Sequence, residues 1–162
     1  MNKIIKLEKF NFHIYIISTY TKGPVKIGFS HHPPSRLKEI QTGNPDKLSL
    51  CGSLSFNQKI IVELIEKIIH SHLKDNNVHL RGEWFNITVK TALSILEHFP
   101  LCRENLFNEV EIKKGKIENT IDLLQYGFQK KIISDDEYDL LNELFLIFDE
   151  DKYQFNDFTT NT

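Results

Sequence analysis

Cysteine and long hydrophobic runs are both scarce in this chain. It has only two cysteines, Cys51 and Cys102, and neither lies close in sequence to another candidate metal ligand. Zinc sites and disulfide frameworks need several such residues at short, regular spacings. We therefore expect neither kind of site, and we interpret both cysteines as buried thiols.

The N-terminal segment also lacks an apolar run of the length that a signal peptide or a membrane span needs. Residues 1–12 mix isoleucines with the charged residues Lys3, Lys6, Glu8 and Lys9. This pattern predicts no targeting segment and no membrane partner. We expect a cytoplasmic protein.

What remains is an ordinary globular composition with an uneven distribution of charge. The 162 residues are 40% hydrophobic and 26% charged, with a net charge of −2. Residues 1–100 carry 13 basic and 8 acidic side chains, whereas residues 101–162 carry 7 basic and 14 acidic ones. The basic first part suits contact with phosphates, and the second part is interpreted as an acidic extension.

The first part predicts a small α/β (α+β) domain with a three-stranded antiparallel sheet flanked by helices. Residues 12–18 and 25–29 are rich in β-branched and aromatic residues around a turn, and residues 48–56 alternate apolar with small polar residues. Pro33 and Pro34 mark the start of a short helix, and residues 58–73 and 89–99 have apolar residues at helical spacing. Either Thr88 or Asn86 would cap the last helix.

Three side chains suited to an anion converge in this arrangement. Tyr15 and Lys26 lie on the two strands of the predicted hairpin, and Arg36 lies on the helix that follows, beside Leu37 and Ile40. A phenol, an ammonium and a guanidinium at one place suit a phosphodiester. A nuclease is the first hypothesis.

Four motifs in order support this hypothesis. They are Lys26-Ile27-Gly28, the run from Arg36 to Gln41-Thr42-Gly43-Asn44-Pro45, Glu66 with His70, and Gly82-Glu83-Trp84-Phe85. Together they resemble the GIY-YIG nuclease superfamily over about residues 12–90, and most closely its phage and bacterial branch. The resemblance implies a divalent-metal-dependent endonuclease that hydrolyses phosphodiester bonds of DNA in a bacterial or phage-infected cell.

The resemblance also implies roles for individual residues. Tyr15 would activate or orient the attacking water, and a neighbouring cation, Lys26, would favour its phenolate form, since a free tyrosine has a pKa of about 10. Lys26 stands where the second motif usually has a tyrosine, and it would either help to deprotonate Tyr15 or simply hold a phosphate. The structural alternatives are a tyrosine that covers the core and a solvated strand lysine.

The remaining site residues come from the two helices. Arg36 would pair with the scissile phosphate, or is a plain surface arginine. Glu66 would hold one Mg²⁺ or Mn²⁺ ion, which suits a single carboxylate with water ligands. His70 would contact the phosphate or protonate the leaving group, or it shields the core.

Two residues of the last motif region remain open. Glu83 is the second choice as metal ligand, or it ties down a loop. Asn86 either joins the site or caps a helix. His31, His32, His72 and His79 show no metal-ligand spacing and are left out of the site.

Residues 101–162 predict a helical hairpin with a frayed tail. Apolar residues from Ile117 to Ile132 suggest one helix, and Ser134-Asp135-Asp136-Glu137 is a capping box that opens a second. The tail from Lys152 to Thr162 is expected to fray. The hairpin would be a scaffold, a homodimer contact, or a brake that competes with DNA.

A second hypothesis is a catalytically weak or inactive module that binds nucleic acid or protein. The lysine in place of the second tyrosine and the acidic extension favour it. Neither hypothesis distinguishes single-stranded from double-stranded DNA, because the extension has no recognisable DNA-reading motif.

Overall fold

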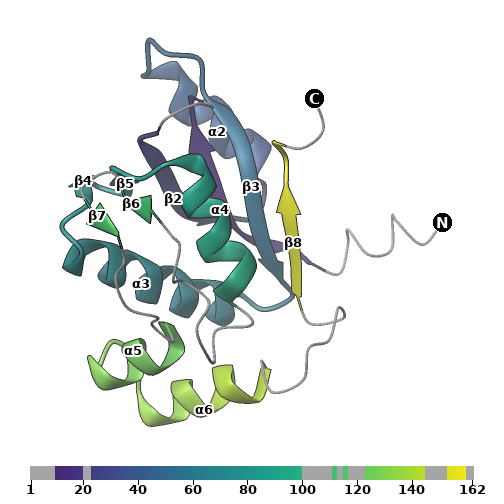
Figure 1. Cartoon of the computed structure of the whole chain (residues 1–162). Helices are drawn as coiled ribbons and strands as arrows, with labels where there is room; N and C mark the ends of the chain where they lie inside the picture. The colour runs from purple at the N-terminus through teal and green to yellow at the C-terminus, as the bar shows by residue number, and fades with distance from the viewer. Residues whose placement is uncertain are drawn as a thin grey trace.

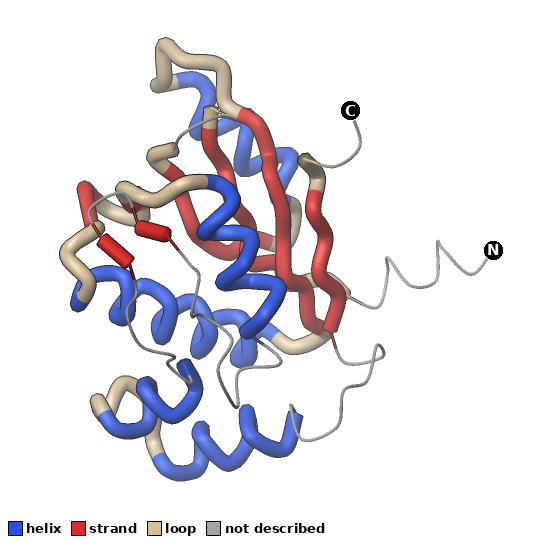
Figure 2. Tube along the Cα trace, in the orientation of Figure 1, coloured by secondary structure: helices blue, strands red, loops and turns tan. Residues whose placement is uncertain are grey.

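The structure, a computed structural model, describes residues 10–19, 23–99, 111–112, 115–116, 123–144 and 153–159. Its centre is an antiparallel sheet of six strands, in the order β4-β5-β2-β1-β3-β8 (Figures 1 and 2). The strands are β1 (Phe12–Ser18), β2 (Val25–Ser30), β3 (Ser49–Phe56), β4 (His79–Arg81), β5 (Trp84–Phe85) and β8 (Tyr153–Asp157). A separate two-stranded ribbon pairs β6 (Glu111–Ile112) with β7 (Gly115–Lys116).

The three predicted strands form the centre of this sheet, and the predicted α+β class is confirmed. β1 pairs with β2 on one side and with β3 on the other, with Tyr15 opposite both Gly28 and Ser53. The expected number of strands was too small, because β4 and β5 have only three and two residues. Segments of that length show no period-two pattern in a sequence.

Helices cover the two faces of the sheet. Helix α2 (Pro33–Thr42) lies on one face, whereas α3 (Lys59–Asp75) and α4 (Val89–His98) lie on the other (Figure 1). Thr88 caps α4 through a hydrogen bond from the backbone N–H of Thr91, so the cap is Thr88 and not Asn86. Among the described residues no helix has the length and apolar character that crossing a membrane requires.

The hydrophobic core is divided by the sheet. The larger cluster, which includes Ile14, Ile16, Ile65, Ile68 and Leu96, fills the space under α3 and α4. A smaller cluster lies on the other face, where Leu37 and Ile40 of α2 pack over Tyr15, Ile17 and Leu48. Both helix residues face inward as expected, and Cys51 is buried as expected. Cys102 lies outside the described residues.

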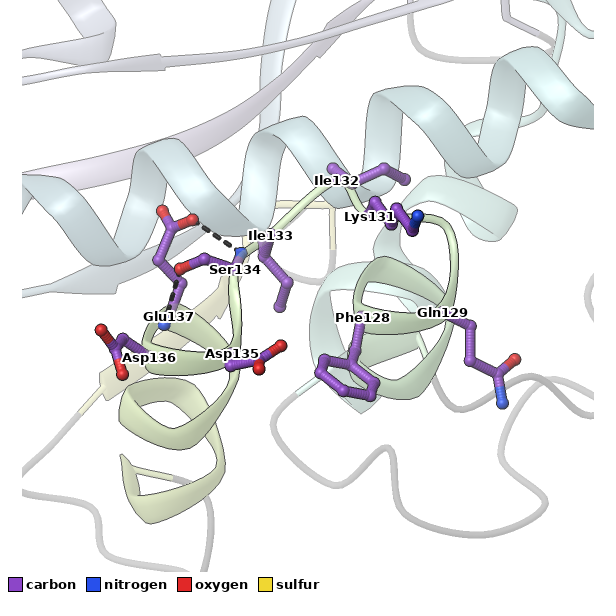
Figure 3. Close-up of a pocket in the computed structure, with 9 residues that line it drawn as sticks. All are labelled: Phe128, Gln129, Lys131, Ile132, Ile133, Ser134, Asp135, Asp136 and Glu137. Atoms are coloured by element: carbon purple, nitrogen blue, oxygen red, sulfur yellow. Dashed lines mark hydrogen bonds between the residues drawn. The ribbon is translucent and has the colours of Figure 1, made fainter.

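Two short helices, α5 (Leu123–Gln129) and α6 (Asp135–Leu144), form the predicted hairpin. The capping box is confirmed: Ser134 N–H donates to Glu137 Oε1 over 2.9 Å, and Glu137 N–H donates to Ser134 Oγ over 3.2 Å (Figure 3). A hollow of about 900 Å³ opens at the turn between the helices, away from Tyr15 and its neighbours. The stretch from Ile117 to Ile121 lies outside the described residues.

The hairpin rests on the rest of the chain through α5, which packs against α3. Gly127 permits this approach, because a Cβ atom there would lie 2.8 Å from Cγ1 of Ile68. Tyr126 adds a hydrogen bond from its hydroxyl to Asp75 over 2.5 Å. The apolar side of α5 is therefore covered by the chain's own domain.

The prediction of a frayed tail from Lys152 was wrong for Tyr153–Asp157. These residues form β8, which pairs with β3 in a continuous register from Tyr153 opposite Phe56 to Asp157 opposite Gly52. Aromatic side chains hold the strand, since Tyr153 is buried and its ring lies 6.0 Å from that of Phe56. A segment at the end of a chain is ordered when sheet hydrogen bonds and apolar burial fix it.

Candidate active site

Tyr15 lies at the centre of the candidate site, on the face of the sheet that α2 covers. Its ring crosses over Gly28, its partner in β2, and the residue is only 1% exposed. A Cβ atom at position 28 would lie 2.6 Å from the Tyr15 hydroxyl oxygen and 2.9 Å from Oε2 of Glu83. The glycine of the Lys-Ile-Gly motif thus leaves the space that both oxygens occupy.

Arg36 reaches the same phenol from α2. Its guanidinium interacts with the Tyr15 phenol, and it donates from Nη1 to Oε2 of Glu39 over 2.7 Å. These interactions raise the pKa of Arg36, and the hydrogen bond with Glu39 contributes most to the shift. The side chain of Arg36 is 43% exposed, so its guanidinium can contact both the buried phenol and the solvent.

The pKa of Tyr15 is raised, mainly because the phenol is buried. The hydrogen bond from Arg36 opposes this shift, whereas the negative charges of Glu83 and Glu66 add to it. The cation that favours the phenolate is therefore Arg36 and not the expected Lys26, and burial outweighs its effect. At neutral pH the phenol keeps its proton.

Lys26 has another partner than the one expected. Its ammonium group donates to Oε2 of Glu83 over 2.7 Å and lies 6.0 Å from the centre of the Trp84 ring. Lys26 is a buried ion-pair partner and not a solvated strand lysine. Its charge is directed at a carboxylate instead of at Tyr15.

Glu83 is brought to this place by the tight turn between β4 and β5. Gly82 adopts a positive φ of 57° in that turn, a conformation that glycine accepts without strain. The carbonyl of Glu83 then accepts a hydrogen bond from Ile27 N–H over 3.1 Å, which fixes the turn against β2. The Gly-Glu-Trp-Phe motif therefore encodes a loop that carries one carboxylate to the sheet.

Glu66 lies on α3, a helix that covers the face of the sheet opposite to α2. Its side chain is 15% exposed, and burial together with the charges of Glu83 and Glu63 raises its pKa to about 7, although Lys26 acts in the opposite direction. A carboxyl group in this position takes up a proton readily in the absence of a cation. It is the side chain that would hold a metal ion here.

His70 lies one turn further along α3, with Nε2 at 3.8 Å from Oε1 of Glu66. The same nitrogen donates to the carbonyl of Ile27 over 2.7 Å, and the ring packs against Phe85. Burial lowers the pKa of His70, so the ring is neutral and its single N–H is already engaged. This arrangement fits the structural alternative, because a neutral His70 in this pose has no free proton for a leaving group.

The comparison with known protein families gives one match, the T5orf172 domain, over residues 12–99. The chain belongs to this family. T5orf172 domains are nuclease-related and GIY-YIG-like, which agrees with the coarser part of the resemblance seen in the sequence. The search of curated proteins and the search of solved structures each gave no match.

The T5orf172 region runs from the first residue of β1 to the end of α4, and it contains every candidate site residue. β8 lies outside it and still belongs to the same sheet. Among the described residues there is no group of three or more His, Cys, Asp or Glu side chains placed to hold a metal ion. Asn86 follows β5, and its backbone N–H donates to the carbonyl of Val78 over 2.7 Å.

Glu83 is the residue of this T5orf172 site whose place the sequence did not predict. The sequence offered it as an alternative metal ligand or loop anchor. Its backbone does fix the loop to β2, and the structure also places its side chain beside Lys26 and Tyr15. Two glycines in the sequence indicate this position. Gly82 allows the tight turn that carries Glu83, and Gly28 leaves the space that its carboxylate occupies. Their joint effect depends on β5 pairing with β2, which no local pattern shows.

Proposed function

We propose that this T5orf172 chain is a divalent-metal-dependent endonuclease that hydrolyses phosphodiester bonds in DNA. One observation carries the proposal: five polar side chains from four different elements and the β4–β5 turn interact with one another beside β2. An ion pair and charge interactions couple them, and they are Tyr15, Arg36, Lys26, Glu83 and Glu66. A nuclease-related family supports the same reaction class. The basic character of residues 1–100 suits a polyanionic substrate.

Glu66 fits a metal ion by its donor chemistry and its surroundings. A carboxylate oxygen is the ligand type that Mg²⁺ and Mn²⁺ prefer. Burial, together with the charges of Glu83 and Glu63, raises the pKa of Glu66 to about 7, so a cation beside it would favour its anionic form. With one protein ligand, the other positions would hold water and substrate oxygens. When bound there, the ion supplies Lewis-acid stabilisation of the charge on the phosphate and the leaving oxygen.

The side chains of the site divide the remaining work. Arg36 has an exposed guanidinium to bind the scissile phosphate, and its hydrogen bond to Glu39 fixes its orientation. The phenol of Tyr15 has an O–H to orient the attacking water. His70 anchors α3 to the backbone of β2 and so keeps Glu66 close to this group.

The test is cleavage of supercoiled plasmid DNA and of its denatured, single-stranded form. We expect product with Mg²⁺ or Mn²⁺ and none with chelator. Arg36→Lys should lower the rate about 100-fold, because lysine loses the planar, forked contact to phosphate. Arg81→Lys, at an exposed arginine of β4, is the matched control and should cleave like the wild type. Metal-independent cleavage, or full activity of Arg36→Lys, would contradict the proposal.

A second measurement examines the metal site without relying on activity. Binding of Mn²⁺, followed by the loss of its free electron paramagnetic resonance signal, should be weakened at least tenfold in Glu66→Gln. Glu63→Gln, one turn earlier on α3, is the control. Equal binding by Glu66→Gln would remove Glu66 from this role.

The second candidate, a module that binds nucleic acid without cutting it, is favoured by one observation. Tyr15 is buried and keeps its proton and Lys26 is paired with Glu83, so neither side chain is placed to deprotonate a water molecule in the arrangement described. A binding module should shift the mobility of DNA equally with metal and with chelator, and it should give no product.

A further inference from the structure

The Tyr15 hydroxyl and Oε2 of Glu83 share the space above Gly28, and the two residues differ in their exposure to solvent. The Tyr15 hydroxyl and Oε2 of Glu83 lie 2.6 Å and 2.9 Å from the position that a Cβ atom would take. Tyr15 is 1% exposed, whereas the side chain of Glu83 is 39% exposed. A water molecule that arrives from solvent therefore meets the carboxylate more readily than the phenol.

The carboxylate of Glu83 is also held in a fixed position. Glu83 is the anionic half of an ion pair with the buried Lys26, at 2.7 Å, and its backbone is fixed by the hydrogen bond from Ile27. Its Oε2 is thus held in place from two sides. Pre-organisation of this kind is what general bases need, since the proton acceptor must lie within hydrogen-bond reach of the attacking water.

The phenol is less suited to that task. Burial raises its pKa and outweighs the opposite effect of the Arg36 guanidinium, so the phenol keeps its proton at neutral pH. A protonated phenol orients a water molecule but does not deprotonate it.

We propose that Glu83 is the general base of this site and that Tyr15 orients the water without losing its own proton. The inference rests on the proposed nuclease function and names the proton acceptor for that reaction. Lys26 acts as a positioning residue, because it holds Oε2 of Glu83 beside the phenol.

The step balances without a further reactant. One O–H bond of the water breaks as its oxygen bonds to phosphorus, and Glu83 takes the proton. The bond from phosphorus to the leaving oxygen then breaks, and the leaving oxygen takes a proton from solvent. Glu83 returns its proton to solvent, so that one water and one phosphodiester become a phosphomonoester and an alcohol.

The first test compares single-turnover cleavage of plasmid DNA by the wild type, Glu83→Gln and Glu63→Gln. Glu63 is a close match, since its side chain has the same 39% exposure and pairs with Lys59 at 3.5 Å. We expect Glu83→Gln to be at least 100-fold slower, as is usual for a lost general base, and Glu63→Gln to cleave like the wild type. Circular dichroism would show that both variants are folded.

Chemical rescue separates a base from a structural residue. Added formate should restore part of the activity of Glu83→Ala, because a small carboxylate fits into the exposed space that the side chain leaves. It should not restore Tyr15→Phe or Glu66→Gln. A residue that only fixes the loop would not respond to formate.

The outcomes keep the two proposals apart. If the wild type cleaves and Glu83→Gln cleaves within about threefold of it, the role of Glu83 is overturned and the nuclease function stands. Failure of formate to rescue an otherwise folded and inactive Glu83→Ala would also overturn that role. If the wild type cleaves no DNA with any metal, both proposals fall.

Discussion

Gly28 has no side chain, and this absence determines the geometry of the candidate site. Gly28→Ala would bring a Cβ atom to 2.6 Å from the Tyr15 hydroxyl and 2.9 Å from Glu83. The ring and the carboxylate would have to move, and we expect a loss of about 100-fold in cleavage, since displacements near 1 Å cost that much. The overpacking should lower the free energy of unfolding by about 1–3 kcal/mol.

Gly43→Ala is the control for this substitution. Gly43 ends α2, its φ of −99° suits any residue, and a Cβ atom there would meet nothing within 4 Å. Cleavage and thermal melting of both variants, measured at a temperature where each is folded, test the prediction. An active Gly28→Ala would mean that Tyr15 and Glu83 need not share this space.

His72 makes the stability of the fold depend on pH. Its ring is buried at α3 against Tyr126, and burial lowers its pKa to about 4, although Asp75 acts in the opposite direction. The unfolded chain binds this proton near pH 6.5, so the stability is complete above that pH and is lost as the pH falls towards 4. The difference between the two pKa values corresponds to about 3 kcal/mol.

Denaturant unfolding of the wild type and His72→Phe between pH 7 and pH 4 measures this contribution. Phenylalanine keeps a ring against Tyr126 and does not titrate. We expect the wild type to lose about 3 kcal/mol relative to the variant over that range. Parallel stability curves would show that His72 is protonated at little cost in the folded state.

At the scale of elements, strong local signals allowed accurate predictions and weak ones did not. The apolar spacing of α3, the Thr88 cap of α4 and the box at Ser134 and Glu137 all lie within one segment, and the structure has each of them. β5 and β8 depend on partners distant in sequence, namely β2 and β3. Pairing of that kind leaves little trace in a short segment.

In the candidate site, too, some contacts could be predicted from the sequence and others could not. Tyr15, Lys26 and Arg36 were predicted to converge, and in the structure Arg36 acts on the phenol of Tyr15, as does the charge of Glu66. The partner of Lys26 was not predicted, because the choice between Tyr15 and Glu83 is made by a turn that begins more than fifty residues later, and that turn is placed by tertiary packing.

The packing of α5 on α3 gives a prediction for an element. Gly127→Val would place a Cβ atom 2.8 Å from Cγ1 of Ile68, in a buried contact that has no room for it. We expect a loss of about 1–3 kcal/mol and faster proteolysis of the hairpin. Gln129→Val, at an exposed position of the same helix, is the control, because it places a valine in α5 without the contact with Ile68. Equal stability of the two variants would show that α5 tolerates a wider separation from α3.

At the scale of the whole molecule, β8 joins the end of the chain to the sheet that carries Tyr15. Removal of residues 153–162 would expose the edge of β3 and uncover Phe56, which packs on Tyr153. We expect a loss of about 3 kcal/mol, near the value for two partly buried aromatic side chains, and a tendency to aggregate through the free edge. Thermal melting and light scattering of the shortened chain test this. An unchanged melting temperature would show that the T5orf172 region does not need the strand.

The central claim is that Tyr15, Arg36 and Glu66 form one hydrolytic site with Glu83. The most direct measurement is single-turnover cleavage of plasmid DNA and its denatured form, in Mg²⁺, by the wild type, Tyr15→Phe, Glu66→Gln and the control Glu63→Gln. The account predicts cleavage by the wild type and the control, and losses of about 100-fold or more in the other two. An inactive wild type that binds DNA equally in chelator, or full activity in Glu66→Gln, would contradict it.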